Sequence, residues 1–332
     1  MTNPYIGHDS QLFGIEEHRL VGGKGDGMRL FQVRNGLGLE FTVSADRCAD
    51  ISRLSYKGDN FSYFSPCGYV SPAYYDGQGS GFLKSFTAGF LTTCGLRAVG
   101  SPCTDSGEEL PLHGNIANTP AESVSAYADE EALHIYAAVR DAVIFGPKLV
   151  LKRHILCSLR ENKIILEDKV TNEGDTPSPL MILYHMNMGY PLLSEYAKLK
   201  IPSVKVTPRD DHAADDIKTW DKILMPQVGF REQCYYHEFT GDKAYAAIYN
   251  MEIRKGLKIS FEPDNLNHFT QWKMMGVKDY VLGLEPGNCH PDGRDVMRRQ
   301  GELTEILPGE EHSFRVDLEI LDGDNQWNSL EG

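Results

Sequence analysis

The stretch ILYHMNMGYPLL, residues 182–193, is a strongly apolar run that contains two polar side chains, and it is informative about the fold when it is read as a β-strand. Successive side chains of a β-strand point to opposite faces of the sheet. Taken as a strand, the run puts large apolar side chains on one face and His185 and Asn187 on the other. Polar groups inside apolar strands are costly unless they are satisfied or used. We therefore expect His185 and Asn187 to have a role on the second face.

Strand patterns of the same kind continue along the chain. Residues 313–321 alternate apolar and charged side chains, which is typical of a half-buried strand. Residues 147–159 and 162–170 read as two further strands joined by a short turn, as in a hairpin. We find no internal repeat, low-complexity tract or linker. The pattern predicts one all-β domain over residues 1–332, built from antiparallel sheets.

Composition narrows the class of protein. The 332 residues are 41% hydrophobic and carry a formal net charge of −14, which argues against nucleic acid and anionic membrane surfaces as partners. No apolar run approaches 18 residues, and the first 20 residues lack a signal-peptide core. The seven cysteines form no C-x-x-C pair. We expect a cytoplasmic protein with reduced thiols, and with neither a structural disulfide nor a zinc site.

A long segment, residues 62–103, interrupts the strand rhythm and is dense in Gly, Ser, Tyr and Phe. Loops of this length are usually functional or disordered, and the aromatic residues argue against disorder. Two interpretations remain open: an aromatic wall of a sugar-binding cleft, or an irregular loop that covers a sheet. The first interpretation predicts ring contacts from Tyr63, Phe64, Tyr69, Tyr74 and Tyr75.

Three further short stretches carry candidate chemistry. His113 precedes Gly114, and Glu285 ends an apolar run where Pro286 disfavours a helix. Asp46 and Arg47 interrupt another strand-like stretch. Each feature alone also fits a structural role: a hydrogen-bonded core histidine, a solvated turn glutamate, or a salt bridge.

Together the stretches resemble the galactose-mutarotase-like (aldose 1-epimerase) superfamily, and in particular its DUF4432 branch. The resemblance runs in family order over most of the chain. It rests on ADRCADI (45–51), GFLTTCGLRAVGSP (89–102), LHGNIANTPAE (112–122), KVTNEGD (169–175), LYHMNMGYPLL (183–193), LGLEPGN (282–288) and LPGEEHSFRV (307–316). It implies a β-supersandwich of two large antiparallel sheets packed face to face with an open cleft. It also implies an isomerase that acts on the anomeric centre of a sugar without a metal or other cofactor.

The resemblance also implies residue roles. Glu285 matches the base that takes the proton from the C1 hydroxyl, His185 matches the acid that protonates the ring oxygen, and His113 matches a supporting histidine. From these roles we expect a bell-shaped pH profile, with the carboxylate controlling the acid limb and the imidazole the alkaline limb. Contacts to the sugar are expected from Asp46, Arg47, Arg97, Asn187, Tyr74 and Tyr75.

Substrate identity and some alternatives stay open at this point. The chain departs from the family pattern at Asn115, where relatives usually carry arginine, and at Arg97, where the branch tends to have Asp or Asn. The same fold could instead serve a non-catalytic carbohydrate-binding or sensor protein, or an epimerase of a modified sugar. A cupin-like metal enzyme would need an H-x-H pair, which the sequence lacks. We expect a small-molecule sugar as partner and a monomer or homodimer as the assembly.

Overall fold

The computed structural model describes residues 4–241 and 244–330, and its largest element is an antiparallel sheet of eight strands. In order across the sheet, the strands are β11 (Ser123–Ala128), β12 (Ala132–Ala142), β13 (Lys148–Ser158), β14 (Lys163–Asn172), β25 (Glu311–Asp322), β21 (Lys255–Phe261), β20 (Ala244–Asn250) and β17 (Ala197–Lys200). The predicted hairpin is confirmed: β13 and β14 pair in antiparallel register on either side of a four-residue connection, residues 159–162.

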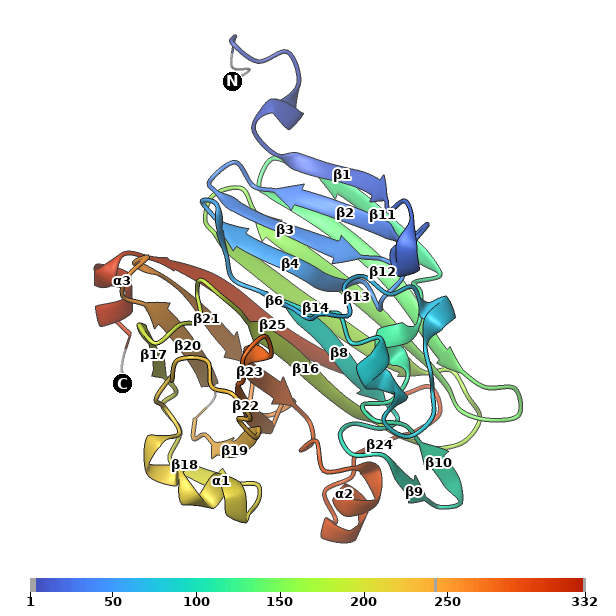
Figure 1. Cartoon of the computed structure of the whole chain (residues 1–332). Helices are drawn as coiled ribbons and strands as arrows, with labels where there is room; N and C mark the ends of the chain where they lie inside the picture. The colour runs from blue at the N-terminus through green and yellow to red at the C-terminus, as the bar shows by residue number, and fades with distance from the viewer. Residues whose placement is uncertain (1–3, 242–243, 331–332) are drawn as a thin grey trace.

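A second layer faces this sheet and is made of two smaller antiparallel sheets (Figure 1). The six-stranded sheet has the order β18 (Lys205–Pro208), β19 (Gln233–Glu238), β22 (His268–Met275), β23 (Tyr280–Gly287), β16 (Met181–Met188) and β8 (Leu91–Leu96). The five-stranded sheet has the order β1 (Gly14–Arg19), β2 (Arg29–Arg34), β3 (Leu39–Ser44), β4 (Asp50–Tyr56) and β5 (Asp59–Asn60). A backbone hydrogen bond of 2.9 Å, from Phe90 N–H to the Ile51 carbonyl, joins the two.

The predicted all-β class and its large antiparallel sheets are confirmed. The main core lies between the layers and takes apolar side chains from both of them. In β25, Phe314, Val316 and Leu318 alternate into this core, as the sequence pattern predicts. The second layer is divided between β4 and β8 rather than continuous.

Short elements fill the sheet edges and connections. Three pairs of short strands are present: β6 (Tyr63–Phe64) with β7 (Ala88–Gly89), β9 (Cys103–Asp105) with β10 (Glu108–Leu110), and β15 (Ser178–Pro179) with β24 (Glu305–Ile306). The α-helices are α1 (Asp211–Asp215), α2 (Arg294–Gln300) and α3 (Asp324–Asn328). The 3-10 turns are η1 (Asp9–Gln11), η2 (Gly23–Gly25), η3 (Pro72–Tyr74), η4 (Gly81–Lys84), η5 (Ile116–Asn118) and η6 (Ile217–Thr219).

A buried charge network crosses the core beneath β16. The guanidinium of Arg153 on β13 is fully buried and donates to Asp168 through Nε and Nη2, at 2.9 and 2.6 Å. Its Nη1 donates to Asp50 on β4 at 2.6 Å. The hydroxyl of Tyr184, on β16, donates to Asp168 at 2.8 Å. The network therefore links both layers and holds β16, the strand that carries His185, in place.

Candidate active site

Two neighbouring strands bring His185 and Glu285 together on the outer face of the six-stranded sheet. On β16, Tyr184 and Met186 point into the main core, so His185 between them points the other way. Glu285 lies on the adjacent strand β23 and pairs in register with Thr270 of β22. His185 Nδ1 and Glu285 Oε1 are 3.3 Å apart, and neither atom has a hydrogen bond within the described residues. His185 is 6% exposed and Glu285 is 2% exposed, so the pair is shielded from water.

His113 reaches the same place from the loop that follows β10. Its backbone has a positive φ of 61°, an uncommon conformation for a residue with a side chain. Its N–H donates to the Gly100 carbonyl at 2.9 Å, which anchors the turn. The rings of His113 and His185 meet edge to face with their centroids 5.6 Å apart. The structure thus places the three residues that the sequence singled out as catalytic around one point.

These side chains line a cavity of about 500 Å³. Aromatic rings form part of its wall: Phe86 contacts His185 edge-on at 5.4 Å between centroids, and Trp272 does so at 5.2 Å. Phe82 packs against His113 at 5.2 Å. Such rings offer large apolar contact surfaces that lose little conformational entropy on binding. The remaining lining residues are Leu83, Gly100, Ser101, Leu112, Arg209, Glu232, Cys234, Thr270, Pro291 and Asp292.

Polar side chains that are hydrogen-bonded to one another or to neighbouring residues line part of this cavity. The indole N–H of Trp272 donates to Glu232 at 2.7 Å, and the Arg209 guanidinium donates to the other carboxylate oxygen at 3.1 Å. Glu232 is exposed and therefore available to a bound molecule. Asp292 accepts a hydrogen bond of 2.6 Å from the Tyr236 hydroxyl. Carboxylates held in this way are suited to accept hydrogen bonds from sugar hydroxyls.

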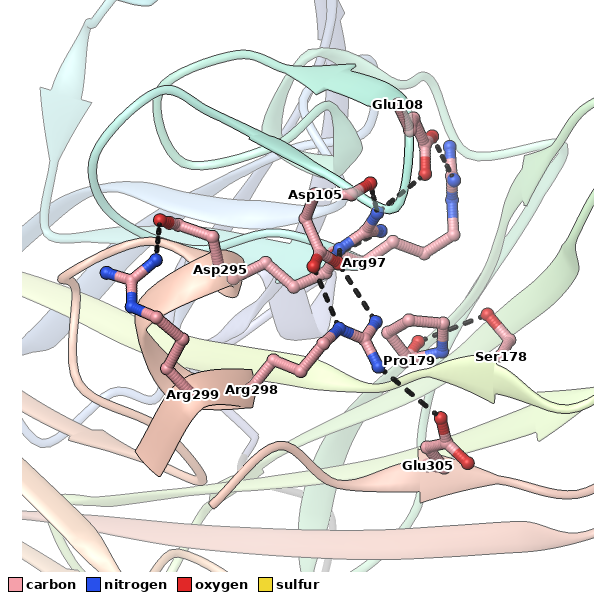
Figure 2. A network of polar contacts seen from close by, with 10 residues as sticks. Arg97, Asp105, Glu108, Ser178, Pro179, Asp295, Arg298, Arg299 and Glu305 are labelled. Atoms are coloured by element: carbon pink, nitrogen blue, oxygen red, sulfur yellow. Dashed lines mark hydrogen bonds and ion pairs between the residues drawn. The ribbon is translucent and has the colours of Figure 1, made fainter. Parts of the chain in front are cut away.

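An ion network lies next to another part of the cavity lining. Residues 100–101 pair with residues 291–292, and all four line the cavity. Behind them, Asp105 on the β9–β10 hairpin accepts hydrogen bonds from Arg298 of α2 at 2.8 and 2.9 Å (Figure 2). Arg294, also on α2, is buried and bonds to Asp105 and to Glu108 at 2.6 and 2.9 Å. The hairpin and α2 are therefore tied together close in sequence to the lining residues 291–292.

Burial sets the protonation of the three candidate catalytic groups. Removal from water, with a smaller contribution from His113, lowers the pKa of His185 to about 3. Burial also lowers the pKa of His113 to about 4. Burial raises the pKa of Glu285 well above its ordinary value; the Glu232 carboxylate raises it further, while Arg209 opposes this. Near neutral pH, both imidazoles are then neutral, and the raised pKa of Glu285 favours the protonated form of its carboxyl group.

Several residues expected to contact a sugar lie outside the cavity. Arg47 is buried and donates to the backbone carbonyls of Ala117, Val70 and Ser85 at 2.6, 2.9 and 2.9 Å. Asp46 accepts a 2.8 Å hydrogen bond from the Arg29 backbone N–H. Both side chains have structural partners, so their positions do not support the expected sugar contacts.

Arg97 also lies away from the cavity. It is buried beside Glu108, with which it forms an ion pair in the network of Figure 2, and its Nε is 3.7 Å from an Asp141 carboxylate oxygen. Asn187 is fully buried beneath the site and donates to the His185 carbonyl at 2.9 Å. Asn187 therefore supports the strand conformation at His185, and it does not line the cavity.

The aromatic-rich segment, residues 62–103, contributes to the cavity, but through residues other than those expected. Tyr74 is 58% exposed, and the Tyr75 hydroxyl donates to the Gly114 carbonyl and the Asn115 side chain at 3.1 Å. None of Tyr63, Phe64, Tyr69, Tyr74 and Tyr75 lines the cavity. The wall from this segment is made by Phe82 and Phe86, which sit in and just after the turn η4.

Sequence reasoning missed Arg209, Glu232, Thr270 and Trp272. The first two sit near the connection between β18 and β19, in acidic sequence that reads as loop. Thr270 and Trp272 are two positions apart on β22, so they lie on the same face of the strand. This spacing was the signal in the sequence that could have identified them. A larger hollow of about 860 Å³ lies on the outer face of the eight-stranded sheet, but it holds none of the three candidate catalytic residues.

The described part of the chain contains no group of three or more His, Cys, Asp or Glu side chains placed to hold a metal ion. Across the same residues, none of the helices has both the length and the apolar character needed to cross a membrane.

Comparisons with known proteins found a family and several solved structures that are similar to this chain. The sequence profile of a family described as "Domain of unknown function (DUF4432)" matches residues 25–320. A crystal structure of a "putative aldose 1-epimerase" from Klebsiella pneumoniae is similar to this chain with 27% identity and a TM-score of 0.88, covering 97% of this chain and 88% of the other. No curated protein matches the chain significantly.

More distant structures share the fold. The galactose 1-epimerase from Lactobacillus acidophilus is 13% identical with a TM-score of 0.65, and the alignment covers 94% of this chain and all of that one (100%). A galactose mutarotase-like protein from Clostridium acetobutylicum is 13% identical with a TM-score of 0.68, covering 94% of this chain and 99% of the other. At these identities the similarity concerns the fold alone.

Proposed function

Since the chain belongs to the DUF4432 family and has the fold of the galactose mutarotase-like proteins, we propose that it is an aldose 1-epimerase-like isomerase. The convergence of His113, His185 and Glu285 on one aromatic-walled cavity carries the proposal. A purely binding site would not require a buried carboxyl group 3.3 Å from a buried imidazole nitrogen. Groups of this kind are costly to bury unless they are used.

The reaction needs one base and one acid on the same C–O unit of the sugar. The proton on Glu285 passes to His185 Nδ1, 3.3 Å away. Glu285, now a carboxylate, takes the proton of the C1 hydroxyl while the other ring nitrogen of His185 gives its proton to the ring oxygen. The C1–ring oxygen bond then breaks and leaves an open-chain aldehyde. Rotation about the C1–C2 bond and reversal of both transfers close the ring to the other anomer, so no proton is gained or lost.

The position of the shared proton fits this cycle. The reaction requires one proton on the pair, and the raised pKa of Glu285 favours keeping that proton there. His185 Nδ1 faces Glu285, which leaves the other ring nitrogen for the substrate. His113, which lines the same cavity with a neutral imidazole, can hydrogen-bond the ring oxygen or a neighbouring hydroxyl. Glu232 and Asp292 are the further acceptors that we assign to sugar hydroxyls.

Activity is tested with a panel of neutral, phosphorylated and oxidised sugars. Magnetisation exchange between α and β signals in NMR measures anomer interconversion above the uncatalysed rate. We expect at least one sugar to exchange faster with protein present. Saturable binding of a sugar without faster exchange would favour the non-catalytic sugar-binding protein.

The pH dependence of kcat/KM, which reports the free enzyme, is expected to be a broad bell. Activity falls at low pH when the pair takes a second proton, and since the pKa of His185 is lowered to about 3, this limb lies well below pH 6. Activity falls at high pH as the pair loses its last proton, through the raised pKa of Glu285. Burial thus reverses the assignment expected from sequence, in which the carboxylate controls the acid limb. An acid limb centred between pH 6 and 7 would contradict this.

Trp272→Ala is expected to weaken sugar binding about tenfold, ~1.4 kcal/mol, because it removes a ring from the cavity wall and a donor from Glu232. Tyr74→Ala is the control, because Tyr74 is exposed outside the cavity. Titration calorimetry with a sugar that binds the unaltered protein measures both. Equal losses from the two substitutions would mean that the aromatic wall is elsewhere.

A further inference from the structure

Gly283 is an unexpected residue in the middle of β23. Glycine weakens a strand because it has no side chain to pack and loses more conformational entropy on folding. Gly283 is not among the described glycines with a positive φ, so its backbone conformation does not require glycine. It lies two residues before Glu285, on the same face of the strand. Its partner in register on β22 is Trp272.

Space is the reason that the structure offers for this glycine. A Cβ atom at position 283 would overlap Oε1 of Glu285, and would lie 3.1 Å from the Glu285 Cδ and 3.0 Å from the Trp272 Cβ. The Glu285 carboxyl group is therefore folded back along its own strand, over the position that a side chain would occupy. The same Oε1 atom is the one that lies 3.3 Å from His185 Nδ1.

We propose that Gly283 is a positioning residue that keeps the Glu285 carboxyl group retracted against His185 on the cavity floor. The inference rests on the proposed function, since it assigns Gly283 a role in the same acid/base pair. Retraction has two consequences. It buries the carboxyl group, which raises the pKa of that group, and it leaves the space above the pair free for a sugar ring.

Gly283→Ala tests the role directly. The added methyl group pushes the carboxyl group toward the cavity and away from His185. We expect kcat to fall roughly tenfold to a hundredfold, the size of effect that a misplacement of about 1 Å produces, with a smaller change in KM. The alkaline limb of the kcat/KM profile should move to lower pH, because the displaced carboxyl group is less buried. A merely structural role would leave that limb in place.

Shortening the acid provides a rescue. In a Glu285→Asp background the carboxyl group is one methylene shorter and cannot reach the new methyl group. Gly283→Ala should therefore lower kcat much less in that background than in the parent, a coupling that a double-mutant cycle measures. Gly276→Ala is the matched control: a Cβ there meets the mobile end of Met274, at 2.8 Å from Cε, and lies outside the site. Equal losses from Gly283→Ala in both backgrounds would overturn the proposal.

A readout without turnover separates this inference from the proposed function. Imidazole NMR signals of His185 in the sugar-free protein report the nearby carboxyl group. We expect Gly283→Ala to shift these signals and Gly276→Ala to leave them unchanged. A shift in a protein that turns over no sugar would support the positioning role and contradict the isomerase. Signals, kcat and pH profile all equal to those of the parent would overturn the positioning role and leave the isomerase intact.

Discussion

Replacing Glu285 by glutamine is expected to lower kcat/KM for anomer exchange by roughly 10²–10⁴-fold, the usual contribution of a general acid or base. The amide keeps the shape of the carboxyl group but can neither take the proton of the C1 hydroxyl nor hold the proton of the resting pair. Since burial raises the pKa of Glu285 and so favours its uncharged form, the uncharged amide suits the buried position, and the fold should be retained.

His185→Asn should have an effect of the same size, because the two groups are 3.3 Å apart and act on one C–O unit. The double variant should be little slower than either single variant, because residues that act as a unit are strongly non-additive. Polarimetry or NMR exchange on a sugar that the parent turns over measures all three. Glu262→Gln, the same change at an exposed glutamate outside the cavity, is the control. Parent-like exchange by Glu285→Gln would refute the mechanism and favour a sugar-binding protein.

Replacing Arg153 by methionine is expected to lower the free energy of unfolding by ~3–5 kcal/mol, the range measured when one partner of a buried ion pair is removed. The guanidinium is fully buried between Asp50 and Asp168, so its loss leaves two carboxyl groups without their cation. The Tyr184 hydroxyl donates to Asp168, so the damage reaches β16 and, through it, His185. Thermal and denaturant unfolding measure the change.

Arg140→Met is the matched control on the neighbouring strand β12. Arg140 pairs with Glu122 and Glu173 at the surface, where ion pairs contribute little, and we expect a change of less than about 1 kcal/mol. Similar losses for the two arginines would mean that the buried network carries no special share of the stability. Retained stability with lost activity in Arg153→Met would mean that the network serves the site more than the fold.

Local sequence patterns determined the class of fold. Alternating side chains, as in residues 313–321, are set by the two-residue period of a strand, and that period needs no knowledge of the partner strand. The same period put His185 on the face opposite Tyr184, which is where the structure has it. The hairpin of β13 and β14 was also predictable, because its two strands are neighbours in sequence.

Local features drew attention to these residues: a histidine inside an apolar strand, a glutamate before proline, a histidine before glycine. Their candidate catalytic roles came from the family resemblance. Their approach to one another was not a local property. His185 and Glu285 are 100 positions apart, and only the pairing of β16 with β23 brings them to 3.3 Å.

Tertiary structure alone decided which polar residues face the cavity and in which direction their pKa values are shifted. Asp46, Arg47 and Arg97 look like ligand-binding residues in sequence, but they have backbone or carboxylate partners in other segments of the chain. Glu232 and Trp272 look ordinary in sequence. They meet at the cavity because β19, which begins directly after Glu232, pairs with β22, which carries Trp272. The pKa directions of His185 and Glu285 follow from burial, which depends on everything packed around them. Sequence therefore determined the strands, because they depend on local pattern, and the family resemblance supplied the candidate acid and base. The shape of the cavity and the pKa shifts of its side chains could be known only from the fold, because they depend on contacts between residues far apart in the chain.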